Sequence, residues 1–200
     1  MTDIQIGGAK RARRGYSLDE VAIAPSRRTR EPEAVSLTWS IDAYRFDTPL
    51  LAAPMDSVVS PDTAVALAGL GVLAVLNLEG LWTRYADPEP LLAQIAGCDA
   101  KAATHTLQEL YAAKPVDPDL VVQRINDLKA AGITVAAGTS PQGAGQLASI
   151  ASQAGVDIVV IRGTTVSAEH VSATEEPINL KKFIHELDAP VIVGGCATYQ

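Results

Sequence analysis

Residues 132–162 read GITVAAGTSPQGAGQLASIASQAGVDIVVIR, and this stretch decides the fold. A short apolar run opens the stretch and a second apolar run closes it. Between them, Ser140-Pro141 pairs a helix N-cap residue with proline, which suits the first position of a helix. Gly155 stands where a glycine closes the far end of a helix. The stretch therefore predicts a strand, a helix over 141–154 and a second strand.

The same signals, an N-cap residue before proline and a glycine after the helix, recur along the rest of the chain. It predicts helices over 61–69, 88–96 and 118–131. A further helix is expected near 178–187, and the segment 101–114 is a candidate for another. Strands are expected at the short apolar runs, which are 49–53, 72–76, 133–137, 156–161 and 190–193.

Strands that are apolar on both faces and alternate with helices are typical of a parallel sheet covered by helices. Units of this size build either an open doubly wound sheet or a β/α barrel. Residues 81–132 show helical patterns without a confident strand, so we expect a helical excursion there. Residues 1–48 form a separate N-terminal segment, with peripheral strands expected at 20–25 and 33–38, and residues 49–200 form the sheet-and-helix body.

Composition excludes several classes of protein. The chain has 200 residues, of which 48% are hydrophobic and 20% charged, enough for a full core. No run reaches the roughly 18 uncharged apolar residues that a membrane span needs, and the polar N-terminus does not resemble a secretory signal. Two cysteines, Cys98 and Cys196, fit neither a disulfide framework nor a zinc site. We therefore expect a cytoplasmic protein with no membrane partner.

Charge is distributed unevenly along the chain. Residues 1–30 hold seven basic and three acidic residues, whereas residues 31–200 hold nine and twenty. The basic run Lys10–Arg14 is of a kind that attracts nucleic acid. A nucleic-acid binder usually carries positive charge over a whole face, however, and the acidic remainder argues against such a partner. A solvated basic tail is the favoured interpretation.

Function in such a sheet sits beyond the carboxyl ends of the strands. Arg162 is the most informative residue there, because a guanidinium at the end of a buried strand needs an acid or a phosphate. A salt bridge to a loop carboxylate and recognition of an anion are equally good interpretations. Gly194-Gly195 permits close backbone approach, and its amides are able to face a phosphate, although a simple turn is the commoner outcome.

The remaining reactive side chains carry weaker signals. Cys196 has no His or Asp that the sequence places beside it, so we expect a buried thiol rather than a nucleophile. His105 and His185 lie in helical stretches and are expected on the surface. His170 follows strand four with Glu169 and is a candidate to line the site, although a role without function is the favoured interpretation. Asp56 stands alone, and a cap on the following helix competes with any catalytic role. No phosphate-binding loop, nucleophile elbow or metal-spaced cluster is present, so no metal site is predicted.

Four segments resemble the IMP dehydrogenase/GMP reductase family. They are the aromatic, acidic and apolar run Tyr16–Pro25, the first-strand motif Thr48–Val59, the second strand Gly69–Asn77 and the fifth strand Pro190–Thr198. The sequence Met-Asp-Ser-Val within the first-strand motif is the most specific of these. The resemblance covers nearly the whole chain and keeps the segments in the family's order.

The resemblance implies a TIM (β/α)8 barrel, of which this chain holds the N-terminal segment and about five βα units. It also implies a purine nucleotide substrate at the strand ends, a nicotinamide cofactor (NAD or NADP) beside it, K+ as an additional ion and a homotetramer. Family dehydrogenases usually carry CBS modules between strands two and three, and the short excursion here resembles the branch that lacks them. The site residues implied are Ala53, Met55, Asp56, Gly194 and Gly195 for the nucleotide, and Arg162, Gly163 and Thr164 for the cofactor.

Three residues depart from the family pattern. Ala53 stands where many members have Ser, Arg162 where they have Asp, and Gly195 where they have Asn. The Asp-to-Arg change inverts the local charge, which is consistent with a phosphate on NADP or with a member that has lost the reaction. The family's catalytic cysteine follows strand six and is expected beyond Gln200, so no catalytic residue is assigned within this chain.

The leading functional hypothesis is oxidation of IMP to XMP with NAD, in which a cysteine thiolate adds to the purine and water releases the product. GMP reductase with NADPH is the second hypothesis, and a non-catalytic nucleotide-binding relative is the third. A barrel of this type has eight strands in about 250 residues. We therefore expect an incomplete barrel that, by itself, is inactive and prone to aggregate.

Overall fold

The computed structural model describes residues 4–8, 10–24, 30–164, 166, 169–170 and 178–196. Contacts divide the chain into two units, Met1–Ser36 and Leu37–Gln200. The first unit holds an antiparallel hairpin of β1 (Ile4–Ile6) and β2 (Lys10–Ala12), followed by the 3-10 turns η1 (Leu18–Glu20) and η2 (Pro32–Ala34). Most of its described side chains are exposed to solvent.

The peripheral strands expected at 20–25 and 33–38 are wrong. Residues that begin both segments form 3-10 turns, in which the Glu20 N–H donates to the Ser17 carbonyl at 3.0 Å and the Val35 N–H to the Pro32 carbonyl at 3.1 Å. A short alternating run becomes a strand only when a partner strand satisfies its backbone, and local turns satisfy these groups instead. The hairpin that does form in this region, β3 (Trp39–Ile41) and β4 (Tyr44–Phe46), lies in the second unit.

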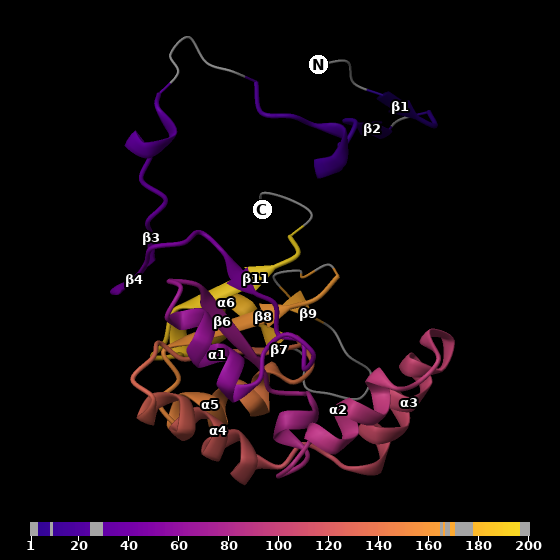
Figure 1. Cartoon of the computed structure of the whole chain (residues 1–200). Helices are drawn as coiled ribbons and strands as arrows, with labels where there is room; N and C mark the ends of the chain where they lie inside the picture. Colours follow the sequence, from indigo (N-terminus) through magenta and orange to yellow (C-terminus); the bar gives the residue numbers. More distant parts are fainter. Residues whose placement is uncertain are drawn as a thin grey trace. The chain divides into compact units, whose positions relative to one another are not determined.

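A five-stranded parallel sheet forms the centre of the second unit (Figure 1). Its strands run in the spatial order β11-β8-β7-β6-β5, which is their order in the sequence. The strands are β5 (Leu51–Ala52), β6 (Leu73–Asn77), β7 (Ala136–Thr139), β8 (Ile158–Arg162) and β11 (Val191–Gly194). This arrangement confirms part of a TIM barrel, with five parallel strands and four covering helices in the described residues, and excludes the open sheet that the residues alone had left open.

Helices cover one face of this sheet. They are α1 (Pro61–Ala68), α4 (Pro118–Ala130), α5 (Ser149–Gln153) and α6 (Leu180–Glu186), and their apolar residues pack on alternate strand residues such as Leu76 and Val159. The other face carries Leu73, Val75, Ile158 and Val160. The β3–β4 hairpin packs against this second face through Phe46, whose ring lies 4.7 Å from that of Trp39. Alternate residues of each strand therefore serve opposite faces, as the two-residue repeat of a strand requires.

The predicted helices form with changed boundaries. The expected helix at 141–154 is divided into a π-helical turn, η4 (Ala144–Ala148), and the shorter α5. The excursion forms α2 (Glu89–Ala96) and α3 (Ala100–Ala113), which pack on each other, after a 3-10 turn, η3 (Leu81–Thr83). Gly71, Gly132 and Gly155 adopt positive φ angles of 74°, 76° and 80°, as the helix-closing positions require.

Two short strands complete the described elements. β9 (Glu169–His170) and β10 (Ile178–Asn179) pair antiparallel next to α6. Within the described ranges, none of the helices combines the length and the apolar character that crossing a bilayer requires.

Candidate functional site

Four residues form an inner rim at the carboxyl ends of the central strands. Asn77 pairs in register with Gly138, and Arg162 with Gly194. All four follow the two-residue alternation of the strand face that carries Leu73 and its neighbours, so they lie on the face away from the covering helices. Two of the four have no side chain. The space beside Gly138 is filled by Pro54 and Val75, whereas the space beside Gly194 is open.

Arg162 is the cation of this rim. It is exposed, and its Nη2 donates to the Asn77 side-chain oxygen at 3.4 Å. The same oxygen accepts the Glu79 N–H at 3.1 Å, so it is fixed in place. Among the described residues no carboxylate forms an ion pair with Arg162. The loop salt bridge that was one interpretation of this residue does not form there, and recognition of an anion stays a prediction.

The loop after β5 is a compact turn that presents Met55. The Met55 carbonyl accepts the N–H groups of Val58 and Val59, both at 2.9 Å. Pro54 is buried against Gly138, where an added Cβ would meet its ring atoms at 3.1 Å. The Met55 side chain remains 52% exposed, which leaves it available to a ligand. Ala53 is also exposed, at the start of this turn.

The Asp56 carboxylate turns into the protein rather than toward a ligand. Its Oδ2 accepts the Leu81 N–H and the Tyr111 hydroxyl, each at 2.8 Å, and its Oδ1 is buried without a hydrogen-bond partner among the described residues. Ser60, not Asp56, caps α1. The nucleotide contact predicted for Asp56 stays a prediction. In this geometry Oδ2 accepts hydrogen bonds from protein donors and Oδ1 is buried.

Tyr111 is a site residue that the sequence did not indicate. It lies near the end of α3, where burial first and the Asp56 charge and hydrogen bond next raise the pKa of its hydroxyl far above the usual range. The Arg84 guanidinium lies 4.9 Å from the centre of its ring, and positive charge from Arg84 and Arg162 opposes the rise in pKa. No pattern in the excursion could have paired Tyr111 with Asp56, which is 55 residues earlier in the chain.

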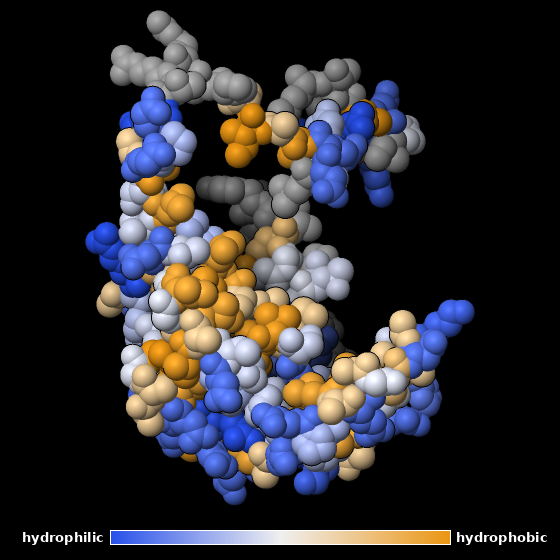
Figure 2. Space-filling view, in the orientation of Figure 1, coloured by the Kyte–Doolittle hydropathy of each residue, from blue (hydrophilic) through white to orange (hydrophobic). Residues whose placement is uncertain are grey.

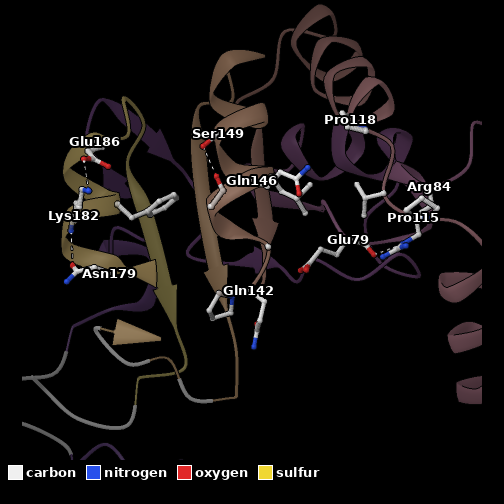
Figure 3. Close-up of a pocket in the computed structure, with 16 residues that line it drawn as sticks. Glu79, Arg84, Pro115, Pro118, Gln142, Gln146, Ser149, Asn179, Lys182 and Glu186 are labelled. Carbon is white, nitrogen blue, oxygen red and sulfur yellow. Dashed lines mark hydrogen bonds and ion pairs between the residues drawn. The ribbon is translucent and has the colours of Figure 1, made fainter. Parts of the chain in front are cut away.

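Glu79 ties two of the site loops together. Its carboxylate accepts the Ser140 N–H at 2.6 Å and the Ser140 hydroxyl at 2.8 Å. A cavity of about 740 Å³ opens beside this contact, between the loops after β6 and β7 and the helix α6 (Figure 3). Glu79, Gln142 and Lys182 are among its lining residues, whereas none of the residues predicted to bind nucleotide or cofactor lines its described wall. The cavity therefore lies next to the inner rim and is separate from it.

The glycines after β8 and β11 bond to each other. The Gly163 N–H donates to the Gly194 carbonyl at 2.8 Å, and the Gly195 N–H donates to the Gly163 carbonyl at 2.8 Å. The Gly195 amide thus has a backbone partner and is not turned toward open space, so a phosphate contact from this donor would require the pair to open. Thr164 is exposed beside them.

The remaining predicted residues are mostly peripheral. Cys196 is exposed, so its expected burial is wrong. His105 and His185 are exposed, as predicted, and His105 lies 3.5 Å from Glu109. The His170 side chain lies outside the described part of the structure. In the described part of the chain, no three His, Cys, Asp or Glu residues cluster as metal ligands do.

Comparison with known proteins adds the evidence that decides the family. The sequence profile of the IMP dehydrogenase / GMP reductase domain matches residues 15–200. The chain belongs to this family. A crystal structure of an IMP dehydrogenase/GMP reductase-like protein from Corynebacterium glutamicum superposes with a TM-score of 0.86 and 44% sequence identity. The match covers 98% of this chain and 53% of that one.

Several curated relatives of the chain are named only by the general class of oxidoreductase. Uncharacterized oxidoreductases of Mycolicibacterium smegmatis and Mycobacterium tuberculosis are each 48% identical to it over 202 residues, which is 98% of the chain. The chain spans 54% of the length of each of these relatives. An inosine-5'-monophosphate dehydrogenase of Methanocaldococcus jannaschii is 30% identical over 66 residues, 33% of the chain.

Proposed function

We propose that the intact protein is a purine-nucleotide oxidoreductase of the IMP dehydrogenase type, which converts IMP to XMP with NAD. The match of the family domain over residues 15–200 is the observation that carries this proposal. The names of the mycobacterial relatives support the broader class, oxidoreductase. The proposal includes a cytoplasmic homotetramer and K+ as an additional ion, since these go with the family resemblance.

The inner rim suits a flat, phosphorylated ligand. We assign the exposed Met55 side chain and Ala53 to contact the nucleotide, with Gly194 leaving room for it. Gly194 has no atom within 4 Å of an added Cβ, so the rim is open at that position. The nicotinamide ring, when bound, accepts a hydride. The catalytic cysteine is expected beyond Gln200 and belongs to the intact protein.

Arg162 favours the second function, GMP reductase with NADPH. Its cation lacks a carboxylate partner among the described residues, and a phosphate is the group that a guanidinium binds best. A phosphate-bearing cofactor would supply such a group, with Gly163 and Thr164 beside it. The three departures from the family pattern, at Ala53, Arg162 and Gly195, motivate the third candidate, a nucleotide binder without activity.

Nicotinamide absorbance with the purified intact protein tests these functions. NADH that forms with IMP supports the dehydrogenase, and NADPH that is consumed with GMP while ammonia is released supports the reductase. Binding of either nucleotide without turnover supports the non-catalytic relative. We expect Arg162→Gln to raise the KM for the phosphate-bearing cofactor on the order of 10-fold and to leave the KM for the cofactor without that phosphate unchanged. If the protein shows neither turnover nor nucleotide binding, the proposal is refuted.

A further inference from the structure

Tyr111 lies on the helical excursion, but its hydroxyl reaches the turn that presents Met55. We propose that Tyr111 is a positioning residue, which acts through Asp56 to hold the 53–59 turn where the purine nucleotide binds. The helical excursion would then help to position the nucleotide site. The nucleotide in this proposal rests on the proposed function, whereas the positioning of the turn does not.

The Asp56 carboxylate depends on very few donors. Within the described residues, Oδ2 accepts two hydrogen bonds, from the Leu81 N–H and the Tyr111 hydroxyl, and Oδ1 accepts none. Gly80 is packed so closely that an added Cβ would lie 1.9 Å from Oδ1. A carboxylate with so few partners is sensitive to the loss of one, because a buried polar group that loses a hydrogen bond costs free energy. Removal of the Tyr111 hydroxyl therefore leaves Asp56 with one donor.

Tyr111 is itself held firmly from the other side. Arg84 stacks on its ring, and the Arg84 Nη1 donates to the Tyr111 carbonyl at 3.1 Å. The Arg84 Nε donates to the Glu79 carbonyl, also at 3.1 Å, so the same guanidinium joins the end of α3 to the loop after β6. The Tyr111 hydroxyl is protonated at neutral pH, as an ordinary tyrosine is, and burial raises its pKa further, so it remains a donor.

The turn transmits the position of Asp56 to Met55. Asp56 follows Met55 directly, and the Met55 carbonyl anchors the amides of Val58 and Val59 at 2.9 Å. Asp56 lies inside the turn that these two hydrogen bonds close. In this proposal, a displacement of its carboxylate therefore shifts the backbone of the turn. The exposed Met55 side chain would then move away from the place where it meets a ligand. This coupling links α3 to ligand affinity without any contact between Tyr111 and the ligand.

The Tyr111→Phe variant of the intact protein tests the proposal. We expect the KM for the purine nucleotide to rise on the order of 10-fold, while the KM for the nicotinamide cofactor stays unchanged. Tyr85→Phe is the matched control, because the Tyr85 hydroxyl donates to the Leu110 carbonyl of α3 at 2.9 Å and does not touch Asp56. A merely structural role would give both variants the same loss of stability and no selective change in KM.

Hydrogen exchange without any ligand separates this proposal from the proposed function. We expect the Val58 and Val59 amides to exchange faster in Tyr111→Phe and at the wild-type rate in Tyr85→Phe. Arg84→Gln loosens Tyr111 but keeps its hydroxyl, so it should raise the exchange rate of the same amides by a smaller amount. If Tyr111→Phe does not fold, Arg84→Gln takes its place in the test. Wild-type exchange in both Tyr111→Phe and Arg84→Gln would overturn the positioning role, whatever the enzyme assays show. Faster exchange with an unchanged nucleotide KM would overturn its link to the nucleotide.

Discussion

At the scale of single residues, the contact between Asp56 and Gly80 is the tightest constraint in the site. The loop after β6 passes over the buried carboxylate, and the space between them holds no further atom. Any side chain at position 80 has to displace Asp56, and the Leu81 N–H and Tyr111 hydroxyl bonds then lose their acceptor. A glycine is required at position 80 for the close approach, not for its backbone angles.

We therefore expect Gly80→Ala to lower the free energy of unfolding by about 1–3 kcal/mol, the usual cost of an overpacked site. Urea unfolding followed by circular dichroism measures the change. Gly145→Ala is the control, because an added Cβ meets no atom within 4 Å there and the residue is exposed in a helical turn. That variant should be as stable as the wild type or more stable by about 0.5–1 kcal/mol. Equal destabilisation of the two variants would contradict the role assigned to Gly80.

Residue patterns predicted the carboxyl ends of the strands better than the contacts made there. The rule that function sits at these ends pointed to Arg162, whose hydrogen bond to Asn77 across the rim only the structure shows. The same rule could not show which way Asp56 turns, since its partner Tyr111 comes from a helix whose docking leaves no local signal. The Cys196 thiol was expected to be buried by residue type alone, but strand β11 ends before it.

At the scale of elements, Arg124 joins α4 to the excursion. This nearly buried guanidinium, 9% exposed, donates to the carbonyls of Trp82 and Ala86 at 3.1 and 2.6 Å. It also lies 5.5 Å from the centre of the Trp82 ring. The loop that opens the excursion thus has its backbone acceptors satisfied by a helix side chain, since it has no strand beside it to do so.

We expect Arg124→Met to lower the free energy of unfolding by about 1–3 kcal/mol, because the Trp82 and Ala86 carbonyls lose their donor while the apolar volume is kept. Asp127→Asn provides the control, since it removes only the partly exposed 3.9 Å ion pair to Arg124 and should cost less than about 1 kcal/mol. Thermal unfolding of both variants measures the difference. A wild-type midpoint for Arg124→Met would show that water satisfies these carbonyls.

The order of strands and helices was predictable because each unit carries its own start and stop signals. Ser60 caps α1 with the reciprocal side-chain and backbone bonds that its position before Pro61 predicts. The helix expected at 141–154 begins late, because Ser140 bonds to Glu79 and the chain makes a π-helical turn first. Such boundaries depend on tertiary contacts, which local patterns do not contain.

At the scale of the whole second unit, the β5 edge of the sheet carries exposed apolar surface. β5 pairs with β6 through only two residue pairs and lies at one edge. Leu50 and Leu51 are 59% and 44% exposed there, and Leu70 is 70% exposed nearby. Hydrophobic residues gather on the visible face of this unit around α1 (Figure 2). Surface of this kind is normally covered by another element or by a partner.

The 200-residue chain, expressed alone, should self-associate as its concentration rises and should bind a hydrophobic dye. Light scattering and dye fluorescence measure the two effects. Leu70→Glu should reduce both, while Gln123→Glu, which adds the same charge at an exposed position of α4, should leave them unchanged. A monodisperse monomer that unfolds cooperatively would show that the exposed edge is tolerated.

The match between spatial order and sequence order has a consequence for synthesis of the chain. Every strand of the sheet pairs with the strand made just before it, beginning with β5 and ending with β11. A strand that emerges from the ribosome therefore finds its template already present and never waits for a distant segment. Each addition closes only the segment that connects neighbouring strands, which is longest between β6 and β7, where α2, α3 and α4 intervene. The sheet is able to grow vectorially, one strand at a time, while translation continues.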